Sequence, residues 1–136
     1  MQGIEFNFFL LCDFINITQE NKPNIIGLFD RIVFPPNSDG NTEIFSSPYI
    51  YWVCNFKSTL QEQISITINL KKEGNQEFLK RIFENTEEQT VAEKTYGIIG
   101  EIPTLPLPGI GVYFIEIIVN GHEIKKIKIP AELRQS

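Results

Sequence analysis

The 136 residues are enough for one ordinary domain, and their hydrophobic and charged fractions, 42% and 21%, are those of a folded globular protein. The net charge of −5 argues against general nucleic-acid binding, because such binding needs a basic surface that displaces counterions. The chain has 22 Ile, 11 Phe and four Tyr against nine Leu and two Ala. Because β-branched and aromatic side chains favour strands, this composition predicts an all-β domain over residues 1–136.

The first half of the chain is a series of β-type runs separated by turn residues. The first run extends from Glu5 to Thr18 and the second from Ile25 to Phe34. A loop-like segment, Pro36 to Pro48, separates them from the aromatic-rich run Tyr49 to Lys57. Isoleucine alternates with polar residues from Gln63 to Leu70, which is the pattern of a strand with one face in water.

The segment Phe78 to Phe83 fits two structures. Its apolar residues recur at helical spacing, and Asn75 is a suitable N-cap. An isolated helix is uncommon in a small sandwich, so we expect a strand here. Glu84 to Thr95 is polar and fits a loop or a weak edge strand, and Gly97 to Ile102 is another short run.

The clearest local signal is the Asn120-Gly121 pair, which lies between two β-type runs, Val112 to Val119 and His122 to Ile129. Asn-Gly favours a type I′ hairpin turn, because both central residues of that turn have positive φ. Taken together, the runs predict an antiparallel β-sandwich, immunoglobulin-like in general form, with about seven to nine strands.

Three groups of residues resemble a known family. They are Cys12-Asp13 after a hydrophobic run, Ile26-Gly27-Leu28-Phe29-Asp30-Arg31-Ile32, and Pro108-Gly109 followed by Tyr113-x-Ile115-x-Ile117 and Asn120-Gly121. From about Phe6 to Ile129 the chain resembles a family of small bacterial proteins of unknown function that are predicted β-sandwiches. The resemblance implies a fold and supplies no catalytic residues.

The sequence offers little for catalysis. The only histidine, His122, directly follows the hairpin turn, and no Gly-x-Ser-x-Gly motif is present. Cys12 and Cys54 lie in apolar runs, where a free thiol behaves as a small hydrophobic group. We therefore expect reduced thiols in preference to a Cys12–Cys54 disulfide, and we expect no enzymatic activity.

Metal binding has only one weak candidate. Zinc is disfavoured because the cysteines and the histidine are far apart in the sequence. The loop before Tyr49 carries alternating oxygen ligands that suit calcium, although it lacks the register of an EF-hand. These candidates are Asn37, Asp39, Asn41 and Glu43. The same residue types are common in any surface loop, so we expect neither a metal nor a cofactor.

Charged residues inside apolar runs have structural explanations. Asp13, Asp30 and Glu116 must face water or find a partner such as Arg31, because an unpaired buried charge is costly. Lysines at positions 125, 126 and 128 fit the usual protection of a terminal strand against edge pairing. An RNA-binding or other anion-binding role is the alternative for these lysines, and the net charge opposes it.

Several runs are apolar on both faces, which suggests association. Alternation places Tyr49, Tyr51 and Val53 on one face of a strand, and Ile50, Trp52 and Cys54 on the other. We therefore expect a non-catalytic interaction or scaffold module that self-associates or joins a protein partner in a larger assembly.

The alternative is a β-sandwich that binds a small ligand or carbohydrate. Its stacking platform would comprise Tyr49, Tyr51, Trp52 and Tyr96.

The apolar run Phe6 to Leu11 lacks a basic residue before it and a small-residue cleavage site after it. No apolar run approaches the ~20 residues of a transmembrane helix. We therefore expect a cytoplasmic protein with no membrane partner.

Overall fold

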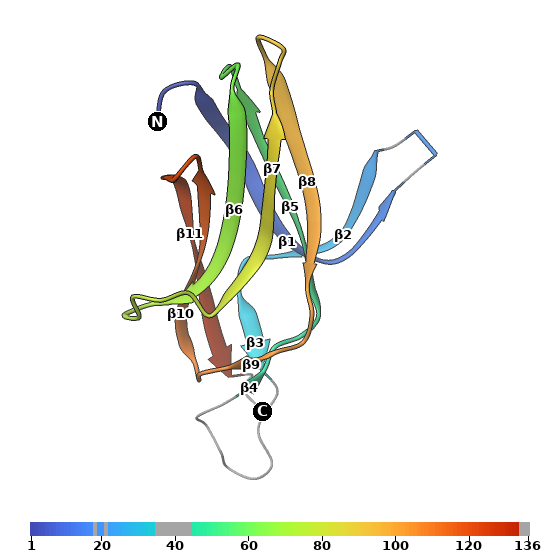
Figure 1. Cartoon of the computed structure of the whole chain (residues 1–136). Helices are drawn as coiled ribbons and strands as arrows, with labels where there is room; N and C mark the ends of the chain where they lie inside the picture. The colour runs from blue at the N-terminus through green and yellow to red at the C-terminus, as the bar shows by residue number, and fades with distance from the viewer. Residues whose placement is uncertain (18, 21, 35–44, 134–136) are drawn as a thin grey trace.

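The computed structural model describes residues 1–17, 19–20, 22–34 and 45–133. Their regular secondary structure consists of strands, so the described residues contain no helix that could cross a membrane. Most of these strands form two sheets that enclose one apolar core (Figure 1). The predicted all-β fold is confirmed.

Sheet A has the strand order β2-β1-β5-β8, and sheet B has the order β3-β11-β10-β6-β7. The strands of sheet A are β1 (Ile4–Ile17), β2 (Pro23–Phe29), β5 (Ile50–Ser58) and β8 (Lys94–Ile102). Those of sheet B are β3 (Ile32–Phe34), β6 (Gln63–Lys72), β7 (Lys80–Glu88), β10 (Gly111–Val119) and β11 (His122–Leu133). Two short strands, β4 (Phe45–Ser46) and β9 (Pro106–Leu107), form a separate pair.

Nine described strands therefore make up the two main sheets. Their pairings are antiparallel except for one, because β3 runs parallel to the end of β11. This pair is a local departure from the predicted antiparallel arrangement. It arises because the chain enters sheet B through β3 directly after β2 and lies beside Ala131 and Leu133.

The two local predictions made from spacing have clear outcomes. Of the segment Phe78 to Phe83, residues 80–83 belong to strand β7, which pairs with β6, and the helical alternative does not form. Asn120 and Gly121 have φ values of 49° and 80°, which confirms the hairpin turn with two positive φ angles. The Asn120 side chain also accepts a hydrogen bond from the Ser65 amide at 2.8 Å, and this bond ties the turn to β6.

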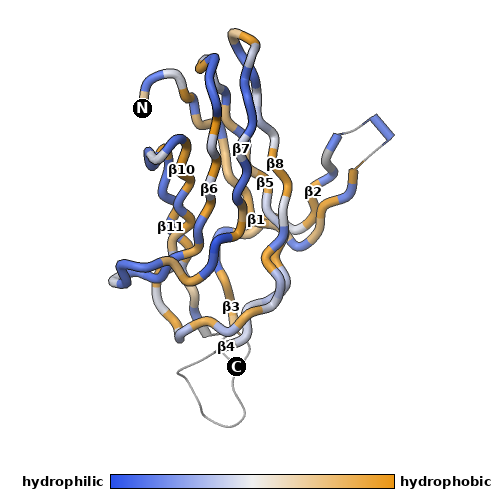
Figure 2. Tube along the Cα trace, in the orientation of Figure 1, coloured by the Kyte–Doolittle hydropathy of each residue, from blue (hydrophilic) through white to orange (hydrophobic). Residues whose placement is uncertain are grey.

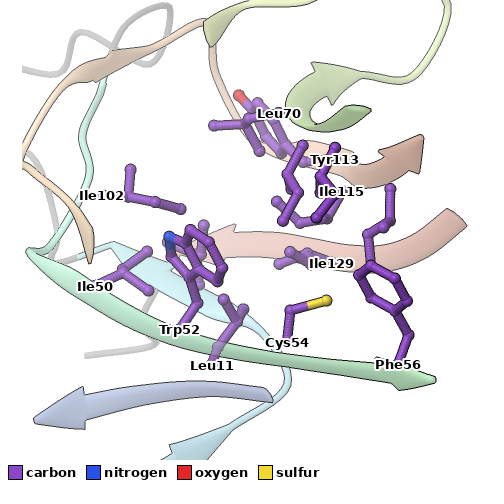
Figure 3. Close-up of a cluster of buried hydrophobic side chains, with 14 of the residues drawn as sticks. Leu11, Ile50, Trp52, Cys54, Phe56, Leu70, Ile102, Tyr113, Ile115 and Ile129 are labelled. Carbon is purple, nitrogen blue, oxygen red and sulfur yellow. The ribbon is translucent and has the colours of Figure 1, made fainter. Parts of the chain in front are cut away.

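Trp52 lies in the apolar core between the sheets (Figure 3). Its ring is fully buried, stacks on Phe9 of the same sheet with centroids 5.6 Å apart, and meets the Phe83 ring of sheet B edge-on at 5.8 Å. Cys54 and Phe56 follow it on the same face of β5, opposite buried isoleucines of sheet B. Aromatic contacts of this kind add to the free energy gained by burying the rings.

Gly100 makes room for the indole ring. It pairs with Trp52 across β5 and β8, and a Cβ atom built at Gly100 would overlap the indole carbon Cζ2. The indole Nε1 is buried and has no hydrogen-bond partner among the described residues. The sheet thus accommodates the largest side chain of the core by omitting a side chain on the neighbouring strand.

We therefore predict that Gly100→Ala lowers the free energy of unfolding by about 1–3 kcal/mol, as overpacking of a core does. Gly97→Ala is the matched control in the same strand, because its Cβ would meet only Asn55 Nδ2, at 3.9 Å. Urea denaturation of the two variants and the parent protein measures the difference. Equal stability of Gly100→Ala and Gly97→Ala would contradict this description of the core.

Candidate functional site

The alternation that buries Trp52 places the other side chains of β5 on the outer face of sheet A. Tyr49 and Tyr51 lie there with ring centroids 5.3 Å apart, and Phe14 meets Tyr51 edge-on at 5.7 Å. Tyr49 is 44% exposed and Phe14 is 46% exposed. These rings are inclined to one another by 49° and 76°, so they form an apolar cluster with no common plane.

The strand register extends this cluster across the sheet. Leu28 of β2 pairs with Cys12 of β1, and Cys12 pairs with Tyr51 of β5. The neighbouring row joins Leu10, Val53 and Ile99 in the same way. We call the resulting surface the outer apolar face; it consists of Phe8, Leu10, Cys12, Phe14, Ile26, Leu28, Tyr49, Tyr51, Val53 and Ile99.

Part of this face lies on a two-stranded arm. Strand β5 supports β1 only as far as Cys12, and beyond that point β1 pairs with β2 alone. The arm, residues 13–17 and 23–26, projects from the body of the molecule (Figure 1). Ile17 and Ile26 are about half exposed in it, and Figure 2 shows hydrophobic segments along it. An isolated two-stranded hairpin is marginally stable in water, so the arm is suited to being covered by another surface.

Polar groups lie at the borders of the outer apolar face. Glu101 of β8 pairs with Tyr51 in register. The Glu101 carboxylate accepts a hydrogen bond from the Tyr49 hydroxyl, and this bond raises the pKa of Tyr49 to about 12. At the opposite end, Lys57 lies 3.3 Å from Glu5 and 3.6 Å from Glu93. These ion pairs are substantially exposed, so they mark the boundary of the face and contribute little stability.

A second concave surface lies between the edges of the two sheets. A groove of about 380 Å³ separates β7 from β8, and Ile66, Phe83 and Ile98 contribute apolar atoms to it. Glu87 and Lys94 also line it, with 2.6 Å between Glu87 Oε1 and Lys94 Nζ. The Glu87 carboxylate raises the pKa of Lys94, so this lysine stays charged.

The four residues of the predicted stacking platform separate into two environments. Tyr49 and Tyr51 belong to the outer apolar face, whereas Trp52 and Tyr96 are 0% and 5% exposed in the core. The Tyr96 ring stacks on Phe56 at 4.9 Å, and its hydroxyl donates to Gln89 Oε1 at 3.2 Å. Of these four residues, the structure thus brings together only Tyr49 and Tyr51. The calcium candidates Asn37, Asp39, Asn41 and Glu43 lie outside the described residues.

The acidic residues of the apolar runs lie in exposed or partly exposed positions. Asp30 and Glu132 both contact the Arg31 guanidinium, at 3.3 and 3.1 Å, and these groups are largely in water. Asp13 is exposed beside Gly27. Glu116 lies half-buried opposite Lys126 in the β10–β11 register.

The lysines at positions 125, 126 and 128 and the histidine lie on strand β11. Lys126 and Lys128 share the outer face of sheet B, as alternation predicts, and Lys126 Nζ lies 4.4 Å from the centroid of the Phe114 ring. His122 is exposed at the start of the strand. Among the described residues, no three His, Cys, Asp or Glu side chains converge as a metal site would require.

A family model describes almost the whole chain. It matches residues 7–132, and its family is described as a family of unknown function, DUF6941. The chain belongs to this family. The expected membership of an uncharacterised family is thereby confirmed. No curated protein matches the chain. The family carries no established activity.

The two surfaces were only partly accessible to sequence reasoning. Two-sided apolarity indicated the outer apolar face, but the position where β5 stops supporting β1 depends on strand register. The groove between β7 and β8 depends on which strands form the sheet edges. Gly97 and Gly100, which leave two positions of β8 without a side chain, were the available signal for it.

The two free thiols lie on opposite sides of sheet A, which explains why they form no disulfide. Cys54 belongs to the core, whereas Cys12 lies on the outer apolar face and donates a hydrogen bond to the Tyr51 carbonyl at 3.6 Å. Both side chains are fully buried. Burial raises the pKa of both thiols, that of Cys54 from 9.0 to about 12.

We therefore predict that neither thiol of the native protein reacts readily with Ellman's reagent at pH 8, because only the thiolate is nucleophilic. Both should react at once in guanidinium chloride. Above pH 9 the unfolded chain releases the Cys54 proton that the native protein retains up to about pH 12. The free energy of unfolding should therefore fall across that range. Rapid labelling of Cys54 under native conditions would contradict the burial described here.

Proposed function

We propose that this protein is a non-catalytic interaction module that docks into a larger protein assembly through the outer apolar face and the arm. The observation that carries the proposal is an apolar surface that extends from β2 across β1 to β5 and β8, in which large exposed side chains surround the buried Cys12 and Val53. Scattered exposed apolar residues are ordinary, but a contiguous apolar surface marks an interaction site.

The size of this surface fits a protein interface. Six of its large side chains are between 38% and 62% exposed. They are Phe8, Phe14, Ile26, Leu28, Tyr49 and Ile99. At ~200 Å² for each large side chain, they present about 560 Å² of apolar surface. One partner in a standard interface buries about 800 Å², of which about 60% is apolar. The outer apolar face alone therefore supplies the apolar part of one such interface.

Other features support the same class of function. Tyrosine and phenylalanine are enriched at interfaces, and the Phe14–Tyr51–Tyr49 cluster supplies both. The mutual inclination of these rings is less suited to the carbohydrate alternative, which needs rings open to a flat sugar face. A cytoplasmic location is part of the proposal, because small secreted domains commonly use their cysteines in disulfides, whereas both cysteines are buried here as free thiols.

We infer, in addition, that the sandwich is immunoglobulin-like in topology. Strands β1, β5 and β8 occupy the places of strands A, B and E in one sheet, and β6, β10 and β11 those of C, F and G in the other. Tyr113, near the start of β10, donates its hydroxyl hydrogen to the Gly109 carbonyl at 2.7 Å. This contact resembles the tyrosine corner of immunoglobulin-like domains.

The experiment compares Leu28→Lys with the parent protein by sedimentation velocity over a wide range of concentrations, and by affinity capture with cross-linking. Leu28 is 62% exposed, so the substitution should leave folding intact. Placing a charge in the interface should weaken association at least about tenfold, or ~1.4 kcal/mol.

The matched control is Val33→Lys, because Val33 is 43% exposed on a strand of the other sheet. Association or cross-linked capture that Leu28→Lys removes and Val33→Lys retains supports the proposal. A protein that stays monomeric and yields no cross-linked partner overturns it. Association that is equal in all three proteins, or binding only to lipid vesicles, also overturns it.

A further inference from the structure

Strand β8 is an edge strand with little protection. Among the described strands it pairs only with β5, so the backbone groups along its other side have no sheet partner. No charged residue lies between Lys94 and Glu101, and two of the six intervening residues are Gly97 and Gly100. Natural edge strands are usually blocked by charges, bulges or proline. Such an edge is a template for a further strand.

The neighbouring edge of sheet B shows the contrast. Strand β7 carries charged residues at both ends and along its length, including Arg81, Glu84 and Glu88. These side chains are exposed and give β7 the usual protection against edge pairing. The two edges lie beside one groove, but only β8 has an uncharged centre.

Open space lies beside most of β8. The 380 Å³ groove between β7 and β8 is lined by residues from Lys94 to Ile99. A second groove, of about 280 Å³, lies between the end of β8 and the arm, on the side of β5 and not at the free edge, and Ile15, Ile17 and Tyr51 line it. The edge therefore has open space beside it, where a neighbouring strand would lie.

We propose that the free edge of β8 binds an extended segment of another polypeptide, which adds to sheet A as a further strand. The segment has apolar residues on both faces of its centre and a basic residue opposite Glu101. This inference goes beyond the proposed function, because the outer apolar face is recognised through side chains and the β8 edge through backbone hydrogen bonds.

The residues around the β8 edge determine which side chains an added strand would carry. Alternate side chains of an added strand would point into the inter-sheet groove, toward Phe83 and Ile98, while the others would lie beside Ile99 on the outer face. Both sides therefore favour apolar residues. Glu87 already pairs with Lys94, whereas exposed Glu101 accepts a hydrogen bond from a neutral tyrosine. A basic residue is therefore best placed at the Glu101 end, and the overall charge of −5 favours it too.

The probe is a short synthetic peptide whose centre alternates valine and isoleucine, so that both of its faces are apolar, with a lysine at each end and blocked termini. We expect saturable changes in the backbone amide NMR signals of residues 94–102, together with slower hydrogen exchange along that strand. The control peptide has the same side chains but is N-methylated at alternate residues. It cannot donate hydrogen bonds from one edge, so its affinity should be at least about tenfold lower.

The matched protein variants are Gly97→Lys and Gln63→Lys. A Cβ atom at Gly97 would make only an ordinary contact with Asn55 Nδ2, at 3.9 Å, so the lysine adds a charge to β8 without disturbing the fold. Gln63 is exposed at the start of β6 and receives the same charge away from β8. Binding that is lost with Gly97→Lys and with the methylated peptide, and kept with Gln63→Lys, supports the proposal. No saturable change at β8, or equal binding of both peptides, overturns it.

Discussion

The burial of Trp52 is the constraint on which the other features of sheet A depend. Its ring fills the space between the sheets against Phe9 and Phe83, so the alternate residues of β5 must face inward with it. Because side chains alternate along a strand, this choice forces Tyr51 and Val53 to the outside. Gly100 belongs to the same arrangement, since the ring occupies the position of its missing Cβ. The outer apolar face is therefore a direct consequence of the core.

Both proposed contact surfaces arise where a strand of sheet A lacks a neighbouring strand. Strand β1 has fourteen residues, but β5 pairs with it only as far as Cys12, which leaves the arm with two strands and apolar side chains in water. Strand β8 lies at the other edge and has no partner beyond β5 among the described strands. The groove lined by Ile17 and Ile99 lies between the arm and β8. The proposed interaction module therefore has an uncovered face, an uncovered arm and an uncovered strand edge.

The sequence predicted most of the strands because the signals for them are local. Alternating isoleucines in β6 and the Asn120-Gly121 turn need no information about distant residues. Alternation separated Trp52 from Tyr49 and Tyr51 but did not indicate which of the two faces is buried. Which side of β5 faces the core is decided by pairing with β1 and β8 and by packing against sheet B. The arm and the groove beside β8 likewise depend on where distant strands end, which local spacing does not encode.

The most direct test of the central claim is hydrogen exchange of the arm, measured by mass spectrometry over a dilution series. The arm has no third strand and little cover of its own, so its amides at residues 13–17 and 24–26 should exchange much faster than those of β5 in dilute protein. They should slow when the protein associates or binds its partner, while β5 stays unchanged. If the arm of the dilute monomer were as protected as β5, it would need no partner and the central claim would be wrong.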